Sequence, residues 1–477
     1  MFDFLKRISP RRGRASAAGV EAQFKNCADY EHRSVTAGRW GVPATACWLD
    51  GCISGDQVSE DILRPLNRLF CRNAGECIDL ALEGGIYSCT VRERKTDEEI
   101  AADLTAGFAA IVFDEIGAAL TFEVKSDNTR SVEIPTVEKS VMGAKDAFVE
   151  TIRVNTSLVR RRLPTPKLKL WETNVGQETK TRVDMLYLDG TAPAEQVEAL
   201  KTRLEKLDVQ GLTAAGELER ALIAPPRGAF PQVLHTERPD RFVLGLLQGK
   251  IGILADGLPV GFLLPGTLPE MMQTQEDRGR HAVVAGFLVA LRWTALLLSL
   301  LVPAVYVAVA MYHQEMIPYK LLLSIIEAKQ AVPFSTAVEV LGMLISFELL
   351  QEAGIRLPEP IGQTVSIIGA LIVGQSAVEA KVLSPIVIIV VAMAGIGSYT
   401  QPSQEVGTAI RLWRFVLVFC AMLLGLFGVM AGLMLLLWRL CDMENLGVSY
   451  LYPLCDGSPK KAVQAITRPP AGKEENR

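Results

Sequence analysis

Several acidic and amide side chains lie inside the apolar C-terminal part of this sequence. Glu348 belongs to an apolar segment that begins near Pro333, and Glu379 follows a second apolar run. A carboxylate in the middle of a membrane costs roughly 3 kcal/mol, so it is expected to face protein or water, where it attracts cations. The pattern therefore indicates a cation pathway. For Glu348, an ion pair with Arg356 or a position near the membrane surface would also satisfy the carboxylate.

The stretch from residue 355 to 384 combines a broken backbone with a regular row of small residues. Pro358 and Pro360 interrupt the backbone, and small residues then recur at every fourth position. On a helix this spacing puts them on one face, where another helix can approach closely. We therefore predict a short helix at 362–379 that packs deep in an assembly. Its small residues are Gly362, Ser366, Ala370 and Gly374, and polar Gln363, Gln375 and Glu379 lie near its ends.

This short helix is the best candidate for a gate. If it lines a water-filled path, its polar residues face that path while the small residues pack between subunits. A helix that only packs against its neighbours has the same signature, so both interpretations stay open. The candidate pathway residues are Glu348, Gln363, Ser366, Ala370, Gly374, Gln375 and Glu379.

The sequence lacks the common motifs of enzyme chemistry. It has no G-x-G-x-x-G or G-x-x-x-x-G-K loop for phosphates, no H-E-x-x-H metal motif and no G-x-S-x-G nucleophile elbow. Its four histidines are far apart. Asp50, Asp189 and Asp256 each stand beside a glycine, which is typical of turns. We therefore expect no enzyme activity, no metal site and no cofactor.

Composition divides the chain near Arg280. The whole chain of 477 residues is 49% hydrophobic with a net charge of −4, but residues from His281 to Cys441 are dominated by aliphatic side chains and glycine. The part before this boundary mixes charged and apolar residues as a soluble protein does. No sustained basic face appears, so nucleic acid is not an expected partner.

The N-terminal segment, residues 1–44, is predicted to be disordered or irregular. Its basic start has no apolar core or cleavage site typical of a secretory signal. Six of the nine cysteines lie between Cys27 and Cys89, at spacings unlike a zinc site. Without an export signal, we expect them to be reduced thiols in a cytosolic domain, with a disulfide or metal role as the alternative.

The part before the boundary contains an apparent duplication. Trp48-Leu49-Asp50-Gly51 recurs as Tyr187-Leu188-Asp189-Gly190, and a Gln-Val pair follows each at the same offset. In each copy a short strand leads through an Asp-Gly turn into a helix. A second pair of strand-turn-strand patterns lies at 110–122 and 251–264. We therefore predict two similar α/β subdomains, at 45–146 and 167–280, joined by a bridging helix at 147–166; chance similarity of common turns is the alternative.

The bridging helix carries a cluster of arginines at its C-terminal end. Arg160, Arg161 and Arg162 there suit the helix dipole. They could also grip an acidic partner or lie against the membrane surface.

The C-terminal part, residues 281–441, is predicted to be a transmembrane helical domain, followed by a cytoplasmic tail at 442–477. Trp293–Tyr312 and Phe415–Trp438 are long enough to cross ~30 Å of hydrocarbon. Residues 321–329 are too short to cross and are expected at the interface, and 401–411 are expected to form a loop. Gly428 and Gly432 lie inside the last span at a helix-packing spacing.

Positive charges predict that both ends of this domain face the cytoplasm. Arginines precede the first span, and lysines and arginines follow the last one. This requires an even number of spans, which four spans plus a helix at 362–379 that does not cross would satisfy. Arg411 and Arg414 then conflict with the positive-inside rule.

These segments together resemble the A subunits of bacterial spore germinant receptors, the GerAA-like family that includes the sporulation protein SpoVAF. The matching segments include N-T-S-L-V-R-R-R-L at 155–163, H-Q-E-M-I-P at 313–318 and the run from Val332 to Pro385. The similarity extends over roughly 45–456.

The resemblance implies a function that composition alone does not. Such subunits reside in the spore inner membrane with a cytoplasmic N-terminal domain and act with B and C subunits. The resemblance also implies a homo-oligomer, with a pentamer as one form, that acts as a channel releasing monovalent cations when germination begins. A SpoVAF-type amplifier of ion release and a non-conducting membrane scaffold are the alternatives.

Overall fold

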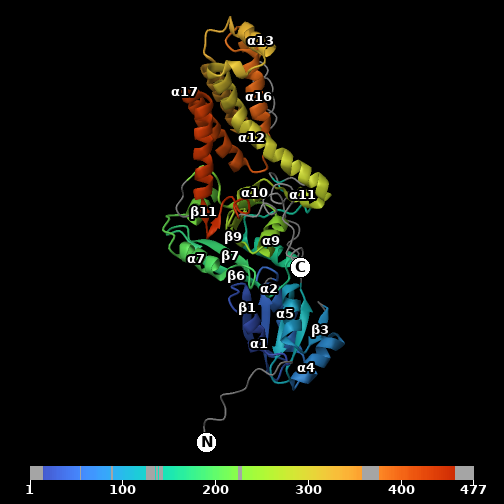
Figure 1. Ribbon diagram of the computed structural model, residues 1–477. Helices are drawn as coiled ribbons and strands as arrows, with labels where there is room; N and C mark the ends of the chain where they lie inside the picture. The colour runs from blue at the N-terminus through green and yellow to red at the C-terminus, as the bar shows by residue number, and fades with distance from the viewer. Residues whose placement is uncertain are drawn as a thin grey trace. The chain divides into compact units, whose positions relative to one another are not determined.

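The computed structural model describes residues 14–53, 55–86, 90–124, 135, 138, 143–223, 228–356 and 375–456. These residues form two compact units (Figure 1). The first, which we call the sheet unit, contains residues 14–223 and 233–265. The second, the helical unit, contains residues 228–232 and 266–456.

The sheet unit begins with a five-stranded antiparallel sheet of order β1-β2-β4-β5-β3. Alternate residues of its strands enter two separate hydrophobic clusters, one on each face, as the two-residue period of a strand requires. Its strands are β1 (Tyr30–Ala37), β2 (Val42–Leu49), β3 (Val91–Arg94), β4 (Phe108–Phe113) and β5 (Ala118–Glu123).

A second five-stranded antiparallel sheet follows, in the order β6-β7-β9-β10-β8. Renumbered from its own first strand, this is the order of the first sheet. Its strands are β6 (Leu168–Val175), β7 (Thr181–Leu188), β8 (Leu234–Thr236), β9 (Ile251–Ala255) and β10 (Gly261–Leu264).

The predicted duplication is confirmed at the level of topology. β2 and β7 hold the same place in their sheets and end at Leu49 and Leu188, the two leucines of the repeated motif. Gly51 and Gly190 then turn the chain with φ of 86° and 75°, a conformation that favours glycine. The predicted strand-turn-strand pairs are β4–β5 and β9–β10.

The helices repeat in the same order. α1 (Ala17–Gln23) precedes β1 and packs with α5 (Asp97–Thr105), just as α6 (Ile152–Arg162) precedes β6 and packs with α9 (Pro239–Leu247). The predicted bridging helix is therefore the first helix of the second subdomain. The remaining helical segments of this unit are α2 (Gly55–Gln57), η1 (Val58–Leu63), α3 (Arg64–Arg68), α4 (Ala74–Leu80), η2 (Ala81–Gly85), α7 (Ala194–Glu205) and α8 (Ala215–Leu222).

Two predictions about the N-terminal part are wrong. Residues 14–44 are not irregular, because α1, β1 and the start of β2 lie there and α1 buries Val20 against the sheet. The cysteines are not all reduced: Cys71 and Cys77 form a disulfide, since the turn between them brings their Cα atoms within 5.1 Å. Cys27, Cys47 and Cys52 are free, and Cys89 lies outside the described residues.

The helical unit is built mainly from long apolar helices. α12 and α17 are long and apolar enough to cross a membrane, with mean hydropathy of 2.2 and 2.5 over an 18-residue window of each, and α16 is apolar but shorter. The elements of the unit are α10 (Leu268–Met271), α11 (Gln275–Gly279), α12 (Ala282–Tyr312), η4 (Gln314–Met316), α13 (Tyr319–Lys329), α14 (Thr336–Arg356), α16 (Pro385–Tyr399), α17 (Gln404–Asp442), β11 (Glu444–Asn445) and β12 (Val448–Ser449).

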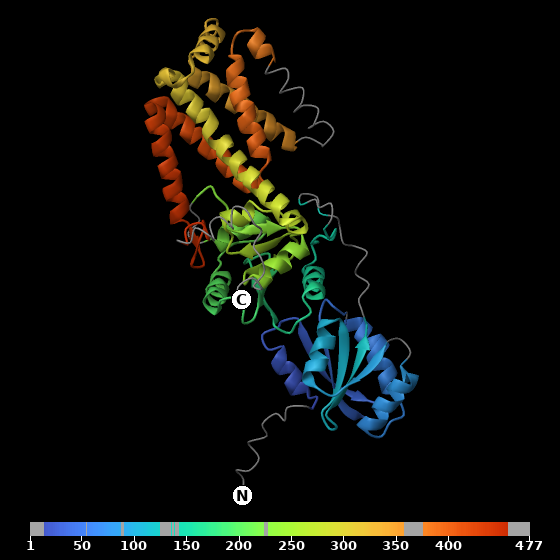
Figure 2. The ribbon, with the colours of Figure 1, turned by 45° about the vertical axis from the view of Figure 1, so that its right-hand side comes forward.

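α17 is a helical hairpin and not the straight span predicted at Phe415–Trp438 (Figure 2). Gly425 breaks the helix with φ 60° and ψ −139°. A Cβ atom on Gly432 would lie 2.7 Å from Leu417 Cδ2. In a continuous helix these two positions would be ~22 Å apart at 1.5 Å per residue, so the chain folds back.

The first arm of α17 also begins earlier than predicted. Residues 401–411 were expected to form a loop, but the helix starts at Gln404. Ser403 caps it, because its hydroxyl accepts a hydrogen bond from the backbone N–H of Val406 at 3.4 Å. The arms at 404–424 and 426–442 each have roughly the length needed to cross ~30 Å of hydrocarbon.

Candidate functional site

A layer of polar side chains crosses the apolar helices of the helical unit. It consists of Glu348 from α14, Arg411 and Arg414 from the first arm of α17, Ser299 from α12 and Ser398 from α16. We call these five residues the polar layer.

Arg414 is the centre of the polar layer. It is only 1% exposed, and Nη2 donates a hydrogen bond of 2.6 Å to the hydroxyl of Ser299 and another to the hydroxyl of Ser398. The two hydroxyls also lie 2.9 Å apart. Arg414 Nε is buried without a hydrogen-bond partner among the described residues. A guanidinium held by two hydroxyls retains a net positive charge inside the bundle.

Glu348 and Arg411 form an ion pair next to this centre. Arg411 Nη1 donates to Glu348 Oε2 at 3.0 Å, and both side chains are three-quarters or more buried. The second carboxylate oxygen, Oε1, is buried and accepts no hydrogen bond from the described residues. With Arg414, the layer has two positive charges and one negative charge.

Arg411 holds the carboxylate of Glu348. The side chain of Arg356, the ion-pair partner that the sequence suggested, lies outside the described residues. Gln375 and Glu379 form a hydrogen bond of 3.0 Å with each other at an exposed position. Gly362, Gln363, Ser366, Ala370 and Gly374 lie outside the described residues. The pathway role of all these residues stays a prediction.

The glycines of the last predicted span lie where two helices meet. A Cβ on Gly428 would come within 2.0 Å of the carbonyl oxygen of Cys420. Gly432 faces Leu417 in the same way. The close approach is between the two arms of α17.

The sequence did not identify Arg414, Ser299 and Ser398 as parts of a site. A signal existed, because an arginine so close to an apolar span conflicted with the expected topology. Small hydroxyl residues in apolar helices are common, however, and only tertiary contact shows which of them receive a guanidinium.

The sheet unit contains a second concentration of buried charge, around Arg153 on α6. Its Nη2 donates to Glu172 Oε2 at 2.7 Å, its Nε lies 3.1 Å from Asp50 Oδ2, and its Nη1 lies 3.7 Å from Asp184 Oδ2. These carboxylates come from both subdomains, so Arg153 joins them. The glycine after Asp50 predicted a turn there. Asp50 also forms an ion pair with Arg153.

Asp184 is the most buried member of this group. It is 0% exposed, and neither carboxylate oxygen accepts a hydrogen bond from the described residues. Burial raises the pKa of Asp184 to about 7, although the nearby Arg153 lowers it.

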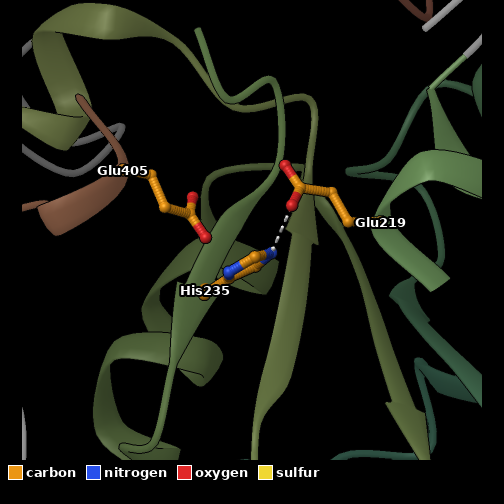
Figure 3. A group of neighbouring side chains, drawn as sticks. All are labelled: Glu219, His235 and Glu405. Atoms are coloured by element: carbon orange, nitrogen blue, oxygen red, sulfur yellow. Dashed lines mark ion pairs between the residues drawn. The ribbon is translucent and has the colours of Figure 1, made fainter. Parts of the chain in front are cut away.

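His235 on β8 lies near one acidic residue of α8 (Figure 3). Its Nε2 is 3.7 Å from Glu219 Oε2, and both side chains are largely buried. Glu405, drawn in the same figure, belongs to the helical unit. Imidazole beside carboxylate is an ordinary ion pair when the histidine is protonated.

The whole-chain comparison decides the family. The model of the Bacillus/Clostridium GerA spore germination protein family matches residues 18–477. The chain belongs to the GerA family. This is a family of spore germination proteins and not a known enzyme class.

Relatives of this GerA-family chain match along most of their length. The "uncharacterized membrane protein YfkQ" of Bacillus subtilis is 35% identical over 94% of this chain and 88% of its own. Spore germination protein KA of B. subtilis is 32% identical over 90% of this chain and 79% of its own. Spore germination protein GerQA of Bacillus cereus is 36% identical over 78% of this chain and 75% of its own.

One solved structure also matches the sheet-containing part. It is the N-terminal domain of the A subunit of the Bacillus megaterium spore germinant receptor GerK3, at 25% identity and a TM-score of 0.40. The match covers 52% of this chain and 92% of that domain.

Proposed function

We propose that this chain is the membrane subunit of a spore germinant receptor and forms an oligomeric cation channel that releases ions when germination begins. Membership of the GerA family supports the germination role. In this proposal it resides in the spore inner membrane, with the sheet unit in the cytoplasm, and acts with B and C subunits. A pentamer is the form that we propose for the oligomer.

The polar layer is the observation that carries the channel proposal. Groups as costly to bury as Arg414 and Glu348 are expected in a membrane segment only where they line water or hold another polar group. Glu348 Oε1, which has no hydrogen-bond partner among the described residues, is a point at which a permeating cation would be stabilised. The positive charges of Arg411 and Arg414 would repel the cation and so limit how tightly it binds there.

The positions of the arginines support the proposed orientation. The backbone carbonyl of Arg292, in the first third of α12, accepts a hydrogen bond from Gln401, just before α17. Arg292, Arg411 and Arg414 therefore lie toward the same end of the bundle. Because α17 starts at this end, the arginines agree with the positive-inside rule if that end is cytoplasmic.

Residues 357–383 connect two points that are well separated. α14 ends at Arg356, whereas Ser384 donates its backbone N–H to Glu339, near the start of the same helix. These points are ~25 Å apart at 1.5 Å per residue. We propose that the stretch between them, with Gln363, Ser366, Ala370 and Gly374, completes the pathway between subunits.

Bilayer recording of the purified full-length chain tests the channel, alone and with its partner subunits. We expect a cation current that Glu348→Gln reduces at least several-fold, since the substitution removes the only negative charge of the polar layer. Glu352→Gln, one turn further along α14, is the matched control. A protein that gives no current with or without partners and ligand would be a scaffold, and the channel proposal would be wrong.

A further inference from the structure

A second set of buried polar groups lies in the helical unit, around Glu339 near the start of α14. Glu339 is 1% exposed, and its Oε2 accepts a hydrogen bond from the backbone N–H of Ser384 at 2.8 Å. Its Oε1 accepts none from the described residues. The buried hydroxyls of Ser384 and Tyr306 lie beside it, and neither forms a hydrogen bond of normal geometry with any of the described residues. Three buried oxygen atoms, from α12, α14 and the residue before α16, therefore lie together without a hydrogen-bond partner in the part of the chain that the structure describes.

A lysine ammonium reaches toward these oxygens from α13. Lys329 Nζ lies 3.7 Å from Glu339 Oε1 and donates a hydrogen bond to the hydroxyl of Thr336. The Lys329 side chain is 26% exposed, whereas that of Glu339 is 0% exposed. The ammonium therefore approaches from the surface. At 3.7 Å it is farther from Oε1 than the ~2.8 Å of a charge-assisted hydrogen bond.

The charge and chemistry of this cluster define the ligand that it suits. The side chains of Glu339, Thr336, Ser384 and Tyr306 all offer oxygen atoms, which alkali and other hard cations prefer. The one carboxylate balances one positive charge, so a divalent ion would leave an uncompensated charge in a region where that is costly. The ammonium of Lys329 is itself a monovalent cation.

α13 buries little of its surface against the rest of the described helical unit. Ile325 is its one buried residue within the described chain. Residues of α12, α13 and α16 line an open apolar pocket of about 380 Å³. Leu321 and Ile325 of α13 line this pocket together with Tyr306, whose hydroxyl belongs to the cluster. Movement of α13 would therefore change the pocket and the cluster together.

We propose that Glu339, Thr336, Ser384 and Tyr306 form a binding site for a monovalent cation such as K⁺, and that Lys329 is a tethered competitor that occupies it in this conformation. The proposal deepens the channel function and rests on it for its physiological role. When α13 moves away, the ammonium leaves and a free cation takes its place.

Thermal unfolding of the full-length chain in detergent tests cation binding at this site and does not require channel activity. The comparison is KCl against N-methyl-D-glucamine chloride at equal ionic strength. In Lys329→Met, K⁺ at about ten times its Kd is expected to raise the unfolding temperature by about 2–4 °C. The wild type and Lys320→Met, which removes the other lysine of α13, should show a much smaller K⁺ effect. Adding Glu339→Gln to Lys329→Met should abolish it.

A labelling experiment on the wild type does not depend on a variant that folds. Acetylation of Lys329, measured by mass spectrometry relative to Lys320, should rise at least threefold as K⁺ replaces N-methyl-D-glucamine. Equal labelling in both salts, or a Lys329→Met protein with no K⁺-specific shift, would overturn the site. If the chain gives the expected result in both tests but no current in bilayer recording, the cation-site proposal stands and the channel proposal is wrong.

Discussion

Arg160 and Asp29 form a bidentate ion pair in which both side chains are 1% exposed. Arg160 Nε and Nη2 donate to the two carboxylate oxygens at 2.8 and 2.9 Å, and Nη1 donates to the carbonyl oxygen of Leu168 at 2.9 Å. Asp29 belongs to the N-terminal segment and Arg160 to α6. The pair therefore fixes the first helix of the second subdomain to the start of the first, and Arg160 is not available to an acidic partner or a membrane surface.

Removing one member of this pair should strongly destabilise the sheet unit. Asp29→Ala leaves a buried guanidinium without its counter-ion, and we expect the free energy of unfolding to fall by about 3–5 kcal/mol. Urea unfolding of the full-length chain in detergent, followed by hydrogen exchange of β6 and β7 amides, measures the loss. Arg161→Ala, an exposed neighbour, should change stability by less than about 0.5 kcal/mol. A loss for Asp29→Ala no larger than that of the control would contradict the assigned role.

Asp184 should make the stability of the sheet unit depend on pH. Its folded pKa of about 7 lies above the ~3.9 of an unfolded aspartate, so the folded state binds the extra proton between these values. The stabilisation of the folded state by this proton is fully present below about pH 4 and is lost as the pH rises through 7. Asp184→Asn should flatten the decline in the free energy of unfolding between pH 5 and 8. Asp189→Asn, in an exposed turn, should leave it unchanged, and equal slopes in the two variants would be evidence against the assignment.

The hairpin of α17 can be captured by a disulfide. A Cβ on residue 432 would lie 3.6 Å from the Cβ of Cys420, within the ~3.5–4.5 Å that disulfides need. In a chain that carries Cys441→Ser and Cys455→Ser, Gly432→Cys should therefore oxidise rapidly to a bond with Cys420, detected by mass spectrometry. Met434→Cys, on the exposed side of the same arm, should not. In a straight helix, positions 420 and 432 would be ~18 Å apart and no bond would form.

The predicted small-residue face at 362–374 is tested by enlarging it. Ala370→Leu or Gly374→Leu should separate the helices that pack there and change potassium release from spores by several-fold. Val373→Leu is the control, because it replaces one large apolar residue with another and leaves the row of small residues unchanged. Normal potassium release and normal germination in both variants would refute the packing proposal.

The duplication was predictable because short sequence patterns recur in both copies. An apolar strand ending in Leu-Asp-Gly depends on few long-range contacts, so Leu49 and Leu188 marked equivalent positions in two sheets. The order of the strands was not predictable in the same way. β3 and β8 return to the far edges of their sheets after long connections, and only packing decides which edge they join.

Local pattern also misled where one residue changes the direction of the chain. Apolar residues continue on both sides of Gly425, so the sequence predicted one span at 415–438. A glycine can be helical or left-handed at little cost, and contact with Tyr312 and the facing arm selects the latter.

By itself, the sequence determined the division into a mixed α/β part and an apolar helical part, the internal repeat, and the family. These depend on composition and on short-range periodicity, which the chain carries wherever it folds. The tertiary structure alone decided the partners of the charges. Arg160 pairs with Asp29, Arg411 with Glu348, and Lys329 with Glu339. In each case the two residues are too far apart in the sequence for a local pattern to predict the pair. A buried charge is stable only beside its counter-ion, so these pairs depend on which helices and strands the fold brings together.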